Sequence, residues 1–299
     1  MLYGCAMSLN LTSKPVVIAA TAGLLILGVG GYVWRQEHRP QNLEVYIFDL
    51  PSGRSMFVRT PDDYRVLIDG GSGPGVIREL TKLLPFYSRR VDALICTDPV
   101  GKNVNGLIAV LDRYQVDKVF VPKVTDQSLG LASSTDQAYE VFLERVKNSS
   151  VVLKEISAGD RVWLGGKVRL AANFPVEVGT DEDRNSRPEF VYSLASSPEI
   201  LFSLKYSNSS LVFIGGASRK VQEYLATAAS GDIVGVDVLV VSHSALKTNM
   251  SQNLLNLTSP KYLIYSKRPA DHDPPDPSGK INTKNGTVHL VSDGASFEI

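Results

Sequence analysis

Hydrophobic and polar residues alternate in short runs through most of the chain, but one long apolar run stands near the N-terminus. This run, Val16–Trp34, has 19 residues and no charge, with Lys14 before it and Arg35 after it. A helix rises about 1.5 Å per residue, so the run covers roughly 28 Å, close to the hydrocarbon thickness of a bilayer. The pattern predicts one membrane-anchoring helix. A cleaved signal peptide and a buried core helix are the alternatives.

From Leu43 onward the pattern changes to short β-rich runs. Residues 43–49, 55–60 and 64–69 are rich in β-branched and aromatic side chains and are separated by Pro, Gly and Asp turns. They predict a meander of three strands. The glycine-rich segment 70–75 ends it, and a helix is predicted over 76–84.

The rest of the chain alternates between predicted strands and predicted helices. The strands are predicted at 92–97, 118–121, 151–156, 161–164, 167–172, 200–206, 211–214, 236–242, 262–266, 287–291 and 296–298, and the helices at 106–114, 137–147, 218–229 and 251–257. Charged or Pro-rich composition predicts loops at 177–187 and 269–279. This order predicts an α/β fold of two sheets with helices outside, a four-layer αββα sandwich.

These patterns divide the chain into four parts. We expect an N-terminal flank over residues 1–15, an anchor over 16–34, a linker over 35–42 and one folded domain over 43–299. Hydrophobic residues make up 43% of the chain, which is enough to build a packed core.

Charge and cysteine content narrow the function only slightly. The 31 basic residues balance the 31 acidic residues, so overall charge provides no attraction to nucleic acid. Four basic residues near one predicted helix, Arg78, Lys82, Arg89 and Arg90, fit a phosphate backbone or a solvated helix face equally well. The two cysteines, Cys5 and Cys96, lie on opposite sides of the predicted anchor, and we expect no disulfide between them.

Four stretches together resemble one protein family. They are VYIFDLPSGRSMFVRTPDDYRVLIDGG, VIRELTKLLPFYSRRVDALICT, SSLVFIGGASRKVQEYL and VDVLVVSHS. Their order and their residue sequences resemble the metallo-β-lactamase superfamily, and within it the soluble domain of ComEC-type DNA-uptake proteins. The resemblance covers residues 43–299 and implies the αββα sandwich already predicted. It also implies an extracytoplasmic location for the domain of a single-pass membrane protein.

The family's chemistry depends on metal ions, and the resemblance allows its ligand positions to be checked. A T-H-x-H-x-D-H loop in the family supplies four ligands, and two bound ions then activate a water for hydrolysis. In the matching loop of this chain, Asp98 replaces the first His and Val100 the second, Lys102 replaces the Asp, and Asn103 replaces the last His. Val100 has no donor atom, and Lys102 would repel a cation.

Three further motifs of the family are also altered or reduced. The bridging Asp of the family's L-T-G-D motif corresponds to Gly216, and its His-His pair corresponds to His243 and Ser244. The family's opening D-V-G-Q-G-D turn ends in Arg54 here instead of a carboxylate. The differences from the family therefore affect the metal-ligand positions, whereas the hydrophobic pattern of the strands is retained.

Some polar residues remain to be interpreted. Asp69, Gly70 and Gly71 follow a strand, and we expect them to organise a structural loop. His243 is expected to make a local hydrogen bond, and His272 to lie in a solvated acidic loop.

Three functions fit these observations. We expect no catalytic residue, no metal and no cofactor, so the domain is predicted to be a pseudoenzyme that binds a partner. The alternative is a metal-dependent phosphodiesterase or nuclease with an altered site built from Asp98, Asp69, His243 and Asn103. A purely structural subunit of a membrane assembly is the third. Expected partners are membrane lipid through the anchor and a protein, and nucleic acid is a possible partner that the charge does not support.

Overall fold

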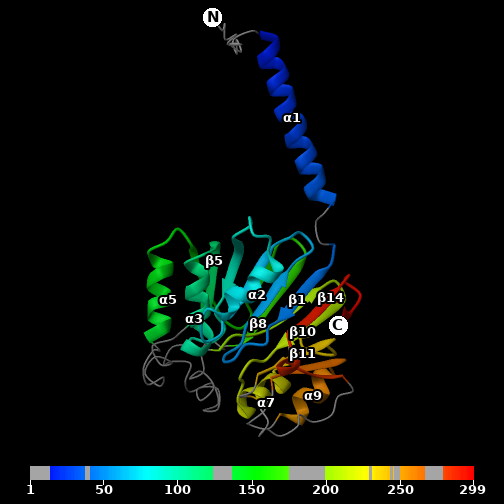
Figure 1. Ribbon diagram of the computed structural model, residues 1–299. Helices are drawn as coiled ribbons and strands as arrows, with labels where there is room; N and C mark the ends of the chain where they lie inside the picture. The colour runs from blue at the N-terminus through cyan, green and yellow to red at the C-terminus, as the bar shows by residue number, and fades with distance from the viewer. Residues whose placement is uncertain are drawn as a thin grey trace, which may run out of the picture. The chain divides into compact units, whose positions relative to one another are not determined.

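Two β-sheets packed face to face form the framework of the domain, in a computed structural model of the protein (Figure 1). The structure describes residues 14–37, 41–123, 137–174, 199–228, 231–242, 245, 250–266 and 279–299, with side chains of the N-terminal helix given for 17–30. Predictions for Cys5, for the loops at 177–187 and 269–279, and for His243, Ser244 and His272 lie outside these residues.

The first sheet has eight strands in the order β15-β14-β1-β2-β3-β4-β5-β6. Strands β1, β2 and β3 pair antiparallel, as a meander should, whereas β3, β4, β5 and β6 are parallel. The strands are β1 (Leu43–Ile47), β2 (Met56–Arg59), β3 (Arg65–Ile68), β4 (Arg90–Ile95), β5 (Gln115–Pro122), β6 (Val152–Ile156), β14 (Val288–Ser292) and β15 (Phe297–Glu298).

The second sheet has seven strands in the order β13-β12-β11-β10-β9-β8-β7. Its β7 to β10 are antiparallel, and β10 to β13 are parallel. The strands are β7 (Arg161–Leu164), β8 (Val168–Phe174), β9 (Leu201–Tyr206), β10 (Ser209–Phe213), β11 (Val238–Val241), β12 (Tyr262–Tyr265) and β13 (Lys280–Asn282).

Helices cover the outer face of each sheet. The first sheet carries α2 (Gly75–Leu83), α3 (Gly101–Leu111) and α5 (Gln137–Lys147), and the second carries α7 (Arg219–Thr227) and α9 (Gln252–Thr258) (Figure 1). Two of them begin at a serine cap: the Ser218 hydroxyl accepts from Val221 N at 3.4 Å, and the Ser251 hydroxyl accepts from Leu254 N at 3.2 Å. A short 3-10 helix, η2 (Thr283–Asn285), precedes β14.

Three apolar layers hold these elements together. Alternating side chains of the strands, such as Val45 and Phe202, fill the space between the sheets, while their neighbours pack under the helices. The layers are therefore helix, sheet, sheet and helix, which confirms the predicted mixed α/β sandwich. The chain separates into two compact units, residues 1–40 and 41–299. The described core clusters lie entirely within 41–299, so this unit carries its own core and is able to fold alone.

The first unit contains helix α1 (Lys14–Glu37). The predicted N-terminal helix is therefore present. Among the residues that the structure describes, however, no helix meets the combined length and hydropathy needed to cross a membrane.

Candidate functional site

The described positions that were compared with the family's metal ligands lie at one end of the sandwich, where parallel strands of both sheets end. Asp98 follows β4 and Gly216 follows β10, and Asp69, predicted to organise a structural loop, follows β3 at the same end. Carboxyl ends of parallel strands are the usual place for ligand sites in open α/β sheets, because the loops that follow them converge there. The fold therefore brings these residues together although they are far apart in sequence.

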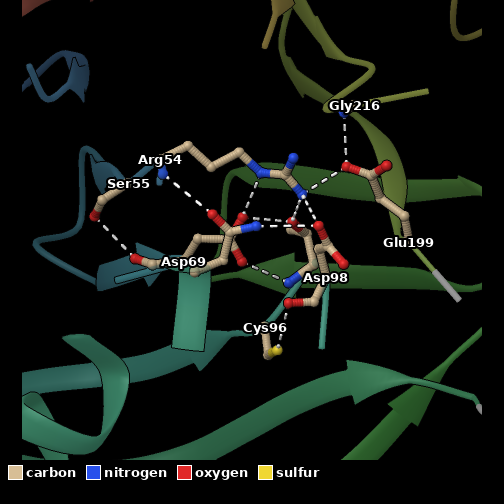
Figure 2. Close-up of polar contacts among 9 residues, drawn as sticks. Arg54, Ser55, Asp69, Cys96, Asp98, Glu199 and Gly216 are labelled. Atoms are coloured by element: carbon tan, nitrogen blue, oxygen red, sulfur yellow. Dashed lines mark hydrogen bonds and ion pairs between the residues drawn. The ribbon is translucent and has the colours of Figure 1, made fainter. Parts of the chain in front are cut away.

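The side chain of Arg54 occupies the centre of this edge (Figure 2). Its Nε lies 2.8 Å from Asp69 Oδ2, and its Nη2 lies 2.5 Å from Glu199 Oε1 and 3.6 Å from Asp98 Oδ2. Nη2 also donates to the Thr97 hydroxyl at 2.9 Å. One guanidinium thus faces three carboxylates from three segments of the chain, and its planar donors suit this arrangement.

The charge on Arg54 is held firmly. Burial opposes that charge, but the carboxylates of Glu199, Asp69 and Asp98 outweigh this effect and raise the pKa of Arg54. The guanidinium carbon also lies 5.2 Å from the centre of the Phe213 ring, within the range of a cation–π contact. Arg54 is therefore a permanent, largely buried cation at this edge, with 15% of its side chain exposed.

Glu199 is the member of the cluster that sequence reasoning did not identify. It stands just before β9, is buried, and accepts a hydrogen bond from Gly216 N at 2.8 Å. Burial raises the pKa of Glu199 to about 7, against the opposing effect of Arg54. A Cβ at Gly215 would lie 1.9 Å from Glu199 Oε1, so glycine at 215 leaves the space that this carboxylate fills.

Asp69 connects β3, β4 and Arg54. It has a positive φ of 56°, an uncommon backbone conformation for a residue with a side chain. Its carboxylate compensates by accepting from Thr97 N at 2.8 Å and from the Thr97 hydroxyl at 2.5 Å, in addition to the Arg54 ion pair. Three donors thus hold the buried Asp69 carboxylate, an arrangement that suits a structural anchor and not a general base.

A close backbone contact fixes the loop after β3 against α3. Gly70 N donates to Asn103 O at 2.7 Å, and Gly106 N donates to Gly71 O at 3.0 Å. A Cβ at Gly106 would lie 1.7 Å from Gly70 O. Glycine is required at this contact because the two backbones touch, which sets the position of the loop relative to the helix.

The donor set at the edge does not fit the metal centre that the resemblance implies. Asn103 is fully buried and its amide is engaged on both sides: Nδ2 donates to Asp98 Oδ2 at 3.1 Å, and Oδ1 accepts from Arg54 N at 3.2 Å. Val100 and Gly216 have no side-chain donor atom. Among the described residues, no group of three or more His, Cys, Asp or Glu side chains is arranged to hold a metal ion.

A cavity of about 160 Å³ adjoins the cluster. Its wall is largely apolar and comes from both sheets. The charged residues on its lining are Arg54, Lys102, Lys284, Asp49 and Asp69. Lys284 Nζ is held by Asp49 Oδ1 at 3.2 Å and Leu50 O at 2.9 Å. The apolar residues include Ile47, Phe48, Leu50, Met56, Ile68, Phe213, Val240 and Ile264.

Comparisons with known proteins support the fold described above and do not extend to an activity. No protein-family model matches the sequence, and no curated protein matches it. Solved structures do match, and they include metallo-β-lactamase superfamily proteins.

Three of these solved structures illustrate the likeness. A variant of the CmlA beta-hydroxylase is 15% identical with a TM-score of 0.50, over 76% of this chain and 46% of its own. Tm1679, described as a metal-dependent hydrolase of the beta-lactamase superfamily, is 14% identical with a TM-score of 0.48, over 83% of this chain and 98% of its own. The Rm3 metallo-beta-lactamase is 15% identical with a TM-score of 0.41, over 66% of this chain and 74% of its own.

These likenesses concern the fold and not the activity, because all of the identities are low. The chain spans less than half of the hydroxylase. The narrower resemblance to ComEC-type proteins remains a prediction.

Proposed function

We propose that residues 41–299 form a non-catalytic metallo-β-lactamase-like domain that binds a partner within a membrane assembly. One observation carries this proposal: the guanidinium of Arg54 stands among Asp69, Asp98 and Glu199, at the edge where the superfamily resemblance places metal ions. A guanidinium supplies positive charge without supplying an open coordination position. It cannot lower the pKa of a bound water as a metal ion does.

The altered-site hydrolase was predicted from Asp98, Asp69, His243 and Asn103, and its described members Asp98, Asp69 and Asn103 would have to be available for an ion or a water. Asp69 is engaged by Thr97 and Arg54, and the Asn103 amide is engaged by Asp98 and the Arg54 backbone. Only Asp98 of these three keeps partial exposure, with 19% of its side chain accessible. A single carboxylate beside a fixed cation is a poor site for a dication, because the cation repels it.

Metal content and turnover test the non-catalytic part of the proposal. Residues 41–299 are incubated with Zn²⁺ or Mn²⁺, desalted and measured by elemental analysis, and then assayed on bis(p-nitrophenyl) phosphate. We expect far less than one ion per chain and no turnover above buffer. Asp112→Ala removes an exposed carboxylate away from the site and serves as the control for Asp98→Ala. Stoichiometric metal with turnover that Asp98→Ala abolishes and Asp112→Ala keeps would establish the altered-site hydrolase instead.

The membrane part of the proposal rests on the apolar surface of α1. Large apolar side chains on its described part are exposed, with Leu24, Leu25, Ile26 and Leu27 each about 70% accessible (71%, 68%, 72% and 74%). Such exposure around a helix is unfavourable in water and favourable in lipid. The full chain is expected to stay with membranes through an alkaline carbonate wash, and its release would refute the anchor. Extracytoplasmic placement of residues 41–299 is proposed from the resemblance, and labelling of a surface thiol from outside the cell would test it.

Partner binding is tested on the full chain in mild detergent. A scaffold subunit should co-purify with a protein partner in fixed stoichiometry, as judged by size-exclusion chromatography and mass spectrometry. Elution of the chain alone, at the mass of one copy in its detergent micelle, would argue against the scaffold role.

A further inference from the structure

The turn between α2 and β4 presents two aromatic side chains to solvent. Phe86 is 92% exposed and Tyr87 is 72% exposed, the largest exposures among the bulky hydrophobic side chains of residues 41–299 that the structure describes. Their rings meet edge to face, with centroids 5.4 Å apart. Leaving two aromatic rings in water is costly, so a pair of this kind marks an interaction surface.

The turn is built to hold these rings outward. Ser88 N donates to Pro85 O at 2.9 Å, which closes a tight turn with Phe86 and Tyr87 at its two central positions. The Ser88 hydroxyl accepts from Arg65 Nη1 at 2.6 Å, and this bond ties the turn to β3. The aromatic pair is therefore held on a fixed support at the end of the sheet.

Positive charge borders the turn on its α2 side. Arg78 and Lys82 share the single carboxylate of Glu79, at 3.3 Å and 2.7 Å. Arg89 is exposed and makes no ion pair or side-chain hydrogen bond within the described part of the chain. Arg90 is paired with two carboxylates, Asp92 and Asp117, so these three side chains carry one net negative charge. Arg78, Lys82 and Arg89 against the single carboxylate of Glu79 carry two net positive charges, so the charge around the turn remains cationic in sum.

The end of the sheet that carries the turn is also the end at which the chain enters the domain. Strands β1, β3 and β4 run in the same direction, so the residues before β4 lie at the same end as those before β1. Three residues separate Glu37, the last residue of α1, from Gln41, the first residue of the second unit. Such a segment reaches at most about 15 Å. With the proposed anchor in the bilayer, the length of this connection limits how far this end of the domain can lie from the lipid surface.

We propose that the Phe86–Tyr87 turn is a second, peripheral contact with an anionic membrane surface. The rings enter the interfacial layer, while Arg89 and Lys82 meet lipid phosphates. The inference rests on the proposed membrane location. The proposed contact also predicts the orientation of the domain on the bilayer. The cluster around Arg54 lies at the opposite ends of β3 and β4, so it would face away from the lipid.

Vesicle binding by residues 41–299, without α1, tests this contact. The probes are phosphatidylcholine vesicles with and without about one quarter phosphatidylserine, in a flotation assay at low salt. We expect binding that is stronger with phosphatidylserine. Phe86→Ser combined with Tyr87→Ser should weaken it by at least about tenfold, since burial of one aromatic side chain already corresponds to that change. Arg89→Gln should weaken binding to the anionic vesicles by about fivefold.

Trp163→Ser is the matched control, because Trp163 on β7 is also an exposed aromatic residue, at 61%. This variant should bind vesicles as the wild type does. Circular dichroism confirms that each variant is folded. Absence of vesicle binding, or equal binding by the Phe86/Tyr87 double variant, would overturn the proposal and favour a protein partner for the turn. The carbonate wash of the full chain tests the anchor separately. A negative vesicle result therefore rejects the Phe86–Tyr87 contact without rejecting the anchor, and release by the wash rejects the anchor alone.

Discussion

Arg54 Nη2 lies 2.5 Å from Glu199 Oε1, and this ion pair joins the two sheets of the sandwich, since Arg54 precedes β2 and Glu199 precedes β9. The resemblance noted from the sequence implies metal ligands from loops of both sheets at this end of the strands. Here a side chain of the protein makes the link. The loops of the two sheets are therefore joined at this edge by ion pairs of the protein itself. The stability of this edge depends on the charge balance among Arg54 and the carboxylates around it.

Removal of the central cation should destabilise the domain strongly. Arg54→Met leaves Asp69, Asp98 and Glu199 without their shared partner, and breaking a buried ion pair in this way typically costs about 3–5 kcal/mol. Chemical denaturation of residues 41–299 in the presence of a chelator measures the loss. Arg113→Met removes an exposed arginine and should change the unfolding free energy by less than about 0.5 kcal/mol. Equal stability of the two variants would show that the cluster is not a structural centre.

The proton on Glu199 should make stability depend on pH near neutrality. Its pKa in the folded domain is about 7, whereas an unfolded glutamate has a pKa of about 4.3. Between these values the folded state binds more protons than the unfolded state, so the contribution of Glu199 is fully present below about pH 4 and is lost as pH rises through about 7.

Thermal melts from pH 5 to pH 8 test this dependence. The wild type should lose stability over this window more steeply than Glu199→Gln, whose amide does not titrate. Glu144→Gln, which alters an exposed glutamate on α5, should retain the wild-type slope. A wild-type slope in Glu199→Gln would assign the pH dependence to another group.

The contact between Gly70 and Gly106 should tolerate no side chain. Gly106→Ala places a Cβ 1.7 Å from Gly70 O, and backbone atoms cannot yield to it without moving the loop after β3 away from α3. We expect a loss of at least about 2–3 kcal/mol in unfolding free energy, measured by urea denaturation. Gly73→Ala is the control, because nothing lies within 4 Å of a Cβ at that position. A Gly106→Ala domain as stable as this control would contradict the close approach of the two backbones.

Cys96 should be inert while the domain is folded. Burial raises the pKa of the Cys96 thiol well above its ordinary value, and its Sγ lies 3.6 Å from Asp98 O in a closed environment. The thiolate is the reactive species, so both burial and protonation slow modification. Residues 41–299 contain this cysteine alone, and a disulfide reagent at pH 8 should label it only in denaturant. Rapid labelling of the native domain would show that the β4 end is open.

The sequence predicted most of the framework because strand and helix periodicities are local signals. It placed the first helix of the αβ alternation at 106–114, whereas α3 spans Gly101–Leu111. Val100 gives no side-chain cap and Gly101 and Gly106 read as loop residues, so nothing in the sequence marked the true start. The sequence did not predict strand β13, because only one of its three residues, Lys280–Asn282, is apolar and so short a segment shows no strand periodicity.

The candidate site was predictable in part. The resemblance singled out Asp98, Asn103 and Gly216, and the structure brings all three into the cluster around Arg54. The substitution that introduces Arg54 was visible in the sequence, but its partners were not. Glu199 lies in no motif, and its contact with Arg54 depends on the packing of one sheet on the other. A signal was available all the same: a charged residue directly before an apolar strand requires a partner if that strand end is buried.

The pairing of β1 with β14 has a consequence for how the protein is made. Val45 and Leu290 are opposite each other in this pair and are both fully buried, and the neighbouring Phe297 on β15 is buried as well. Strand β1, the first strand of the domain to be synthesised, therefore lacks this neighbour until β14 has been synthesised, and long-range pairings of this kind form slowly. The domain completes its fold only after residues 288–298 have been synthesised. Until β14 and β15 are available, the incomplete sheet leaves the nascent chain able to pass through a secretion pore, which suits the proposed placement outside the cytoplasm.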